Sequence, residues 1–213
     1  METQILFEND DFIAVEKPVG IATTVERKKE VICLLQRIRE EYGIPYMAVH
    51  RLDKEVSGAL LFAKHAQAHK QLNLKFDRRE IKKTYLAVVH GAIRTQTGEI
   101  NQPIRQFGSG RMGVDPARGK PSLTCFTRVK RTSAYSLLQL QALTGRRHQL
   151  RVHLYSIGHP IVGDSHYGDR AIQKQYPRLM LHAHTIELEW NGQDMIRIES
   201  KPPEIFYSFF PRA

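Results

Sequence analysis

The sequence predicts a mixed α+β fold with a largely antiparallel sheet core and flanking helices. Strand-like runs outnumber helical ones, and several follow one another along the chain with no helical segment between them. A doubly wound fold would instead alternate strands with helices. The chain has 213 residues, 41% of them apolar, with only 14 glycines and 10 prolines, so it is globular and long enough for one sizeable core or two small domains.

Nine runs have the composition and length of strands. Most are short, rich in apolar residues and bounded by turn-forming or charged residues. They span Ile5–Phe7, Phe12–Glu16, Met47–Arg51, Ala59–Ala63, Lys82–His90, Ser122–Lys130, Ser136–Leu143, Met180–Glu189 and Met195–Ser200.

Helical periodicity is clearest in two segments, Val31–Tyr42 and His65–Phe76. In both, apolar residues recur every three or four positions and so fall on one face of a helix. A third helix is expected from Arg146 to about Ile157, after Thr144-Gly145.

Two segments interrupt this patterning and are predicted to be loops. The first runs from Thr23 to Glu30 and is charged; the second runs from Gln106 to Pro121 and combines four glycines with basic residues. The second is not a Walker A loop, because Pro121 stands where a serine or threonine should follow the lysine. A basic loop that contacts nucleic acid and a plain solvated hairpin both remain open for it.

The charge of the chain favours a polyanionic partner. Lysine and arginine number 32 against 22 acidic residues, a formal net charge of +10, and the sequence pI is about 9.7. RNA, DNA and an anionic membrane surface all fit this charge. No run approaches the roughly 18 apolar residues of a spanning helix, so we expect no membrane association.

We expect a cytoplasmic protein with reduced cysteines. The N-terminal residues are acidic and lead into a strand-like run, which is unlike a signal peptide. Cys33 and Cys125 lie far apart in apolar surroundings, a pattern typical of buried free thiols and unlike a disulfide framework or a metal site.

One carboxylate stands out in the segment His50-Arg51-Leu52-Asp53-Lys54-Glu55-Val56-Ser57-Gly58. Asp53 lies among basic side chains and between two apolar runs, so it is expected in the connection between two strands. A loop anchored on rigid elements can expose a catalytic group and still hold it in place. The alternative is a turn aspartate paired with Arg51 or Lys54.

The segment Thr144–His153 carries the second polar cluster. On a helix, Leu150, Leu154 and Ile157 would pack inward, whereas Arg147, Arg151 and Tyr155 would share another face. Cations near a helix start oppose the helix dipole, so these arginines indicate a bound anion or a carboxylate partner. The five-residue spacing of His148 and His153 does not place them together for a zinc site.

Six elements, in order, resemble the RluA-like RNA pseudouridine synthases. They cover roughly residues 12 to 190, and six in the right order are far more specific than any one alone. They are Lys17-Pro18-Val19-Gly20 (KPxG), His50–Asp53 (HRLD), Lys83–Ala87 within Lys82–Ala87 (KxYxA), Thr144–His153 (TGRxHQ(I/L)RxH), Gly163–Gly168 (GDxxYG) and Leu181-His182-Ala183 (LHA). One position departs: Val56 stands where the family usually has threonine, which puts a local turn contact in doubt.

The resemblance implies a pseudouridine synthase fold and a role for three residues. Asp53 would be the catalytic carboxylate, Tyr85 the ring beside the flipped uracil, and Arg151 the cation that pairs with Asp53 and keeps it ionised. Asp53 could act as a nucleophile, stabilise positive charge on the sugar, or take the 2′ proton to give a glycal, and the sequence does not choose among these.

The resemblance also implies RNA as the partner, either tRNA or rRNA. The basic and imidazole side chains near the motifs would contact it, namely His50, Arg51, Lys83, Arg146, Arg147 and His148. Lys17 would hold backbone near Asp53 or cap a loop. The reaction requires no redox group or metal ion, so no cofactor and no metal are expected.

Residues 1–213 are expected to form a single catalytic domain of the family's short form, without a separate S4-type RNA-binding domain, and a monomer. Two other functions are compatible with parts of the pattern. A non-catalytic RNA-binding module would share the charge, and a base-removing glycosylase would share the flipped base and the carboxylate. The buried acid argues against a pure binder, and an abasic product would identify a glycosylase.

Overall fold

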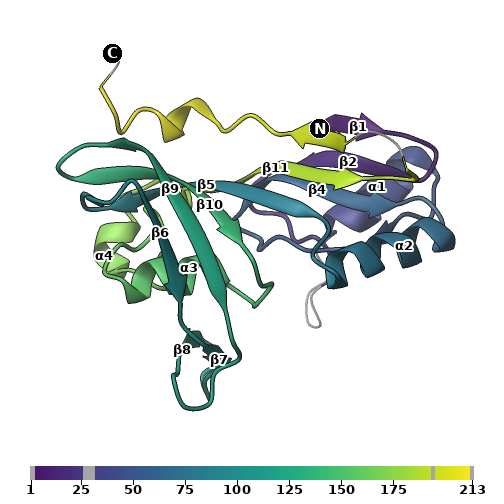
Figure 1. Ribbon diagram of the computed structural model, residues 1–213. Coiled ribbons are helices and arrows are strands. Elements are labelled where there is room, and N and C mark those ends of the chain that lie inside the picture. The colour runs from purple at the N-terminus through teal and green to yellow at the C-terminus, as the bar shows by residue number, and fades with distance from the viewer. Residues whose placement is uncertain (1–2, 26–31, 193–194, 212–213) are drawn as a thin grey trace. The chain divides into compact units, whose positions relative to one another are not determined.

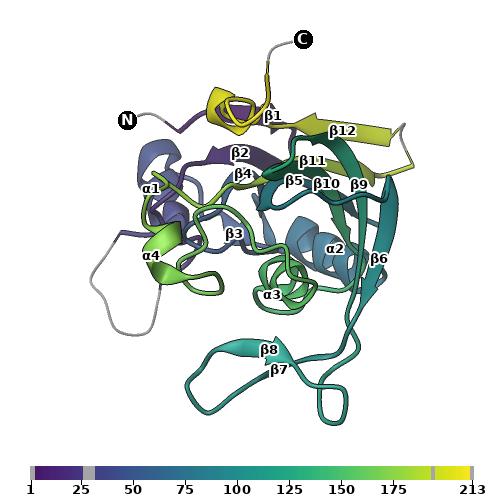
Figure 2. The same cartoon turned by 90° about the vertical axis from the view of Figure 1, so that its left-hand side faces the viewer.

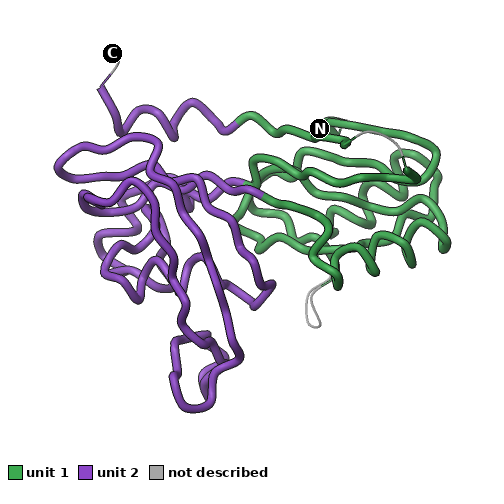
Figure 3. The backbone as a smooth tube through the Cα atoms, viewed as in Figure 1, with its two compact units in different colours: residues 1–83, 183–201 green, residues 84–182, 202–213 purple. Residues whose placement is uncertain are grey.

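A computed structural model describes residues 3–25, 32–192 and 195–211, and the chain divides into two compact units (Figure 3). Unit 1 comprises residues 1–83 and 183–201, and unit 2 comprises residues 84–182 and 202–213. Two of the three boundaries fall within long strands, β5 (Lys82–His90) and β11 (Leu181–Glu189), and the third lies between Lys201 and Pro202. Whether the chain acts as one catalytic domain stays a prediction.

Unit 1 is built on a sheet in which β4 lies between β2 and β11. Its strands are β1 (Ile5–Glu8), β2 (Phe12–Lys17), β3 (Met47–Ala48), β4 (Ser57–Ala63), β11 and β12 (Met195–Glu199). The order is β1-β2-β4-β11, with β12 on β11 and β3 on β4. β2 and β4 are antiparallel from Phe12↔Ala63 to Lys17↔Gly58. All seven residues of β4 are buried, which explains its continuous apolar sequence.

Two helices lie on one side of the unit 1 strands, α1 (Leu34–Tyr42) and α2 (Ala66–Asp77) (Figure 2). Ala68 and Leu72 of α2 enter a core that includes Phe12, Leu61 and Trp190. The helix α1 ends at Gly43, whose φ of 67° is the left-handed conformation that glycine adopts at no steric cost.

Unit 2 contains a second antiparallel group of strands, a short hairpin and small helices (Figure 1). The strands follow the order β5-β10-β9-β6, with β6 at Thr97–Asn101, β9 at Leu123–Arg131 and β10 at Tyr135–Ala142. The hairpin pairs β7 (Ile104–Gln106) with β8 (Met112–Val114). The helices are α3 (Gln149–Ser156), α4 (Arg170–Gln173) and a 3-10 turn at Glu204–Phe206.

The predicted fold class is confirmed, and each of the nine predicted runs contains a strand, eight of them with shifts of at most two residues at either end. The run Met47–Arg51 shortens to two residues, because the backbone leaves the sheet after Ala48. The hairpin β7–β8 extends into the predicted loop Gln106–Pro121, and β6, α4 and the 3-10 turn had no prediction. Residues 26–31, which include most of the first predicted loop and the predicted helix start Val31, lie outside the described part of the chain.

Two further expectations need correction. The third helix begins at Gln149 and not at Arg146, because His148 has a φ of 54°, outside the helical region. Cys33 is buried, but Cys125 is only half-buried because its neighbours Thr124 and Phe126 take the inward positions of β9. Both thiols are free, as predicted.

Candidate active site

Asp53 lies in the loop between β3 and β4, as predicted, and is half-buried. The loop turns tightly, because the amide of Val56 donates to the carbonyl of Asp53 at 3.0 Å. Lys54 and Glu55 are exposed at the turn, and the chain enters β4 at Ser57. The carboxylate therefore sits directly before a fully buried strand, where a rigid element supports it.

Lys17 holds the backbone of this loop. It is fully buried, and its Nζ donates to the carbonyls of Pro18 at 3.0 Å, Lys54 at 3.2 Å and Val56 at 2.6 Å. A buried ammonium must be satisfied by such acceptors, because leaving its donors unpaired is costly. Of the two roles open from the sequence, the structure supports the first: Lys17 fixes backbone near Asp53.

Val56 contributes to the turn through its backbone. Its amide and carbonyl make the two contacts just described, while its side chain is buried with 3% of its surface exposed. An apolar side chain suits that environment. Neither of these turn contacts depends on the hydroxyl that the family's usual threonine would supply.

His50 and Lys83 flank the ring of Phe76. The Nε2 of His50 accepts from the amide of Leu61 at 3.0 Å, and the His50 ring lies 4.9 Å from that of Phe76. Burial, helped by the positive charge of Lys83, holds the pKa of His50 well below its usual value. The neutral, bonded imidazole has a structural role in β4, and its contact with RNA stays a prediction.

Lys83 is a desolvated cation. Its Nζ lies 4.9 Å from the centroid of the Phe76 ring, and burial lowers its pKa to about 8. Arg51, by contrast, is exposed. Of the predicted unit 1 contacts for RNA, Arg51 thus offers the most accessible positive charge.

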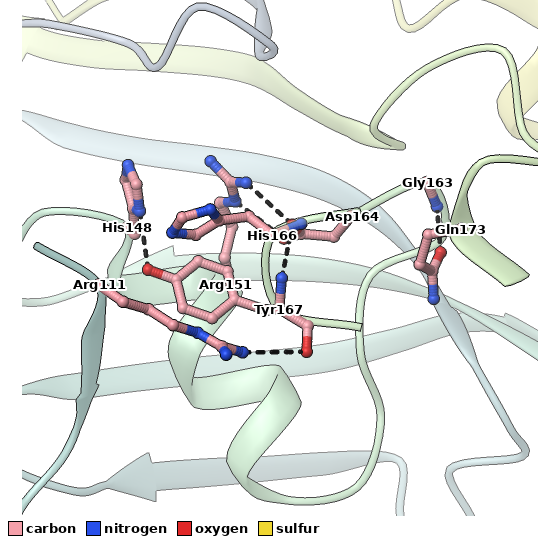
Figure 4. A network of polar contacts seen from close by, with 8 residues as sticks. All are labelled: Arg111, His148, Arg151, Gly163, Asp164, His166, Tyr167 and Gln173. Carbon is pink, nitrogen blue, oxygen red and sulfur yellow. Dashed lines mark hydrogen bonds and ion pairs between the residues drawn. The ribbon is translucent and has the colours of Figure 1, made fainter. Parts of the chain in front are cut away.

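In unit 2, Arg151 forms a buried ion pair with Asp164 (Figure 4). Its Nε and Nη2 donate to the two carboxylate oxygens at 2.8 and 2.9 Å. The side chains of Arg151 and Asp164 are 5% and 1% exposed. This bidentate geometry fixes the plane of the guanidinium, and it supplies the carboxylate partner that the arginine-rich segment predicted.

Asp164 also organises the turn that follows it. Its Oδ1 accepts from the amides of His166 and Tyr167 at 3.1 and 3.2 Å. The buried Tyr167 ring then lies 5.2 Å from the guanidinium carbon of Arg151, and its hydroxyl and the Nδ1 of His148 are 2.7 Å apart (Figure 4). This GDxxYG segment is one of the six motifs, but no role was predicted for any of its residues. The motif was the sequence signal that could have indicated them.

The predicted faces of α3 are only partly correct. Leu150 and Leu154 are buried and Ile157 half-buried, but Arg151 is buried too, whereas Arg147 and Tyr155 are exposed. Arg147 precedes the helix, so the spacing of four residues that would align it with Arg151 does not apply. The six residues Gln149–Leu154 are all buried.

The remaining predicted residues of unit 2 have distinct surroundings. Tyr85 is half-buried on β5, opposite Leu140 of β10. Arg146 is half-buried and its Nε donates to the carbonyl of Pro121 at 3.4 Å, while His148 adopts the left-handed conformation. Asp53, His50, Arg51 and Lys83 belong to unit 1, and Tyr85, Arg146, Arg147, His148 and Arg151 to unit 2. The pairing of Asp53 with Arg151 stays a prediction.

The described residues contain no group of three or more His, Cys, Asp or Glu side chains placed to hold a metal ion. His153, for example, is buried and bonded to Thr124 Oγ1 and to the carbonyl of Gln102, both at 2.9 Å, and burial lowers its pKa. None of the helices within the described ranges is long and apolar enough to cross a membrane.

Comparison with known proteins identifies the family of this chain. A family model described as RNA pseudouridylate synthase matches residues 11–156. The chain is also 35% identical over 196 residues to the dual-specificity RNA pseudouridine synthase RluA of Pasteurella multocida, across 87% of this chain and 89% of that protein. The chain belongs to the RluA-like RNA pseudouridine synthases. It is thus an RNA-modifying isomerase, as the motifs predicted.

Further relatives agree with this RluA-like assignment. The uncharacterized RNA pseudouridine synthase YhcT of Bacillus subtilis is 39% identical over 87% of this chain, which spans 64% of that protein's length. Among solved structures, human RNA pseudouridylate synthase domain containing 1 matches 98% of this chain and 86% of its own, with a TM-score of 0.83 and 28% identity.

Proposed function

We propose that this RluA-like synthase converts specific uridines of tRNA or rRNA into pseudouridine, with Asp53 as the catalytic carboxylate. The observation that carries the proposal is the support of Asp53: a half-buried acid directly before a fully buried strand, on a loop whose carbonyls bind the buried Lys17. Such support preorganises a reacting group.

The reaction defines what these residues must do. The N1–C1′ bond of uridine breaks, the uracil turns, and a C5–C1′ bond forms; C5 loses a proton and N1 gains one, so mass is conserved. Asp53 would act at C1′ as a nucleophile, as a stabiliser of positive charge, or as the base for the 2′ proton. Tyr85 would stack on the extruded uracil, with its hydroxyl near the C5 proton.

Arg151 would orient Asp53. Its bidentate bond with Asp164 fixes the plane of the guanidinium, and a guanidinium presents more donors than one carboxylate accepts. A guanidinium already fixed in its plane loses little conformational freedom when it binds again.

The RNA class is the finer part of the proposal. The Pasteurella relative is named a dual-specificity RNA enzyme, and a relative from Yersinia pestis, 32% identical over 206 residues, is named a tRNA pseudouridine synthase. Both tRNA and rRNA are therefore tested, and Arg51, Arg146 and Arg147 are the proposed backbone contacts.

The test is tritium release from RNA labelled at uridine C5, with separate unmodified tRNA and rRNA pools. We expect release by the wild type and a loss of at least about 10³-fold for Asp53→Asn, because the group acts in the transition state. Asp10→Asn, an exposed carboxylate of the same unit, is the matched control and should keep full activity.

Intact-mass analysis of the nucleosides separates the competing outcomes. An isomer of unchanged mass supports the proposal, and an abasic product would indicate a glycosylase. Tight RNA binding without release from either pool would contradict the proposed reaction on these substrates, as would an active Asp53→Asn variant.

A further inference from the structure

We propose that Thr23 is a positioning residue for Asp53, whose hydroxyl fixes the backbone on the N-terminal side of the carboxylate. The inference rests on the proposed function and extends it to a residue outside the six motifs. Thr23 lies in unit 1, three residues after Gly20.

The hydroxyl of Thr23 makes two bonds to one residue. Its Oγ1 accepts from the amide of Leu52 at 3.2 Å and donates to the carbonyl of Leu52 at 3.1 Å. A hydroxyl can do both at once. Leu52 directly precedes Asp53, and the side chains of Thr23 and Leu52 are 2% and 7% exposed. Water therefore cannot readily replace the hydroxyl.

Thr23 is itself attached to the start of α1. The amide of Leu35 donates to the carbonyl of Thr23 at 3.1 Å, and that of Leu34 to the carbonyl of Ala22 at 2.9 Å. The first amides of a helix have no partner within it, so these carbonyls satisfy two of them. Since Leu34 and Ile38 are buried, α1 is anchored in the core and holds the backbone of Thr23 in place.

The same short segment also holds the other side of Asp53. The amide of Gly20 donates to the carbonyl of Lys54 at 2.8 Å, and the Nζ of Lys17 reaches the same carbonyl at 3.2 Å. Leu52 and Lys54, the residues on either side of Asp53, are thus both held by the segment Lys17–Thr23, which comprises the end of β2 and the turn after it.

This arrangement predicts an effect on the reaction beyond an effect on stability. Without the hydroxyl, the amide and the carbonyl of Leu52 lose this partner, and the loop loses its attachment to Thr23 on the N-terminal side of Asp53. A displacement of about 1 Å at a reacting group can cost about 10²-fold in rate. RNA contacts made by arginines elsewhere on the chain would be unchanged.

The variant Thr23→Val removes the hydroxyl and keeps the shape of the side chain. Under single-turnover conditions with saturating RNA, we expect the rate of tritium release to fall about 30-fold or more, with the RNA dissociation constant within about twofold of the wild type. Thr23→Ser keeps the hydroxyl and should restore the rate to within about threefold.

Ser136 offers a matched control. Its buried hydroxyl also makes two backbone bonds, accepting from the amide of Ile93 and donating to the carbonyl of Gly91, both at 2.9 Å, in unit 2. Ser136→Ala should lower the melting temperature in a similar way but leave the single-turnover rate near that of the wild type. The difference between the two variants isolates the positioning effect from general loss of stability.

The outcomes distinguish this inference from the proposed function. If the wild type releases no tritium from any RNA pool, the proposed function fails and the role of Thr23 with it. If the wild type is active but Thr23→Val keeps its rate, or Thr23→Ser loses as much as Thr23→Val, the inference alone is wrong. Should Thr23→Val not fold, Thr23→Cys replaces it, with an expected loss of about fivefold; a wild-type rate for that variant overturns the proposal.

Discussion

At the scale of single residues, the candidate site depends on charged groups that the fold has buried together with their partners. Lys17 is satisfied by carbonyls, and Arg151 by a carboxylate that is itself bound to two amides. Burial of such groups is tolerated only when these partners are in place. Removing one partner of a buried charged group should therefore lower the free energy of unfolding by more than removing an equivalent group at the surface.

Asp164→Asn tests this for Arg151. The substitution keeps the size of the side chain but removes its charge and one acceptor, so the buried guanidinium loses the negative charge of Asp164. We expect a loss of about 3–5 kcal/mol in the free energy of unfolding, measured by urea denaturation. Arg197→Ala is the control, because Arg197 is 57% exposed and pairs with Glu187 at the surface; its loss should stay below about 1 kcal/mol. Equal losses of stability for the two variants would contradict the burial of the Arg151–Asp164 pair.

Lys83 gives a dependence of stability on pH. Its pKa falls from an ordinary value of 10.5 to about 8 in the folded chain, because burial disfavours the charged form. Between pH 8 and 10.5 the unfolded chain therefore binds more protons at this position, so the contribution of Lys83 to stability rises with pH. Below pH 8 both states are protonated, and the destabilising effect is present in full.

The variant Lys83→Met removes this effect. It should be more stable than the wild type near neutral pH, and its advantage should shrink as the pH rises from 8 to 10.5. Urea denaturation at four pH values across this range measures the difference, with the neighbouring exposed Lys82→Met as control. A difference that stays constant across this range argues against a desolvated lysine.

At the scale of elements, the strands were predictable because their signals are local. Continuous apolar runs mark β2 and β4, and both are almost fully buried. The start of α3 was missed because the left-handed His148 has no local sequence signal, and such conformations are uncommon outside glycine. A hairpin was one of the two alternatives left open for Gln106–Pro121, but the strands β7 and β8 were not predicted, because they have only three residues each.

The motifs proposed residues for the candidate site, but of the contacts that support these residues only the role of Lys17 was among the predicted alternatives. The motifs indicated Asp53, Tyr85 and Arg151, yet the partners of these segments come from far along the chain. Lys17 binds the carbonyl of Val56, and Thr23 binds Leu52 across 29 positions. A lysine at a strand end normally indicates a solvated position, and only the acceptors from a distant loop make its burial possible.

Gly58 shows how closely the elements of unit 1 approach each other behind Asp53. It is the second residue of β4 and has a φ of 117°, and a Cβ there would lie 2.2 Å from the carbonyl oxygen of Ala183. Any other residue would have to displace the backbone of β11. The glycine of the HRLDxxxSG segment is thus required by the close approach of β4 and β11.

At the scale of the whole molecule, the net charge of +10 decides how the protein meets its substrate. Under the proposed function, exposed cations such as Arg51 and Arg147 would attract any RNA, whereas Asp53 would act only on a uridine that has left its stack. Binding and chemistry would then depend on different residues. They should respond differently to salt and to substitution of Asp53.

The salt dependence of RNA affinity separates binding from chemistry. If about four phosphates are neutralised, RNA affinity should fall about 10²-fold between 50 and 200 mM salt, because bound counterions are released on association. Asp53→Asn should bind with the same slope of log affinity against log salt, since the substitution removes the reacting carboxylate and leaves the exposed cations in place. Fluorescence anisotropy with labelled tRNA and rRNA measures both slopes. Tight binding that does not change with salt would show that surface charge does not drive association, and a flatter slope in the variant would place Asp53 among the binding groups.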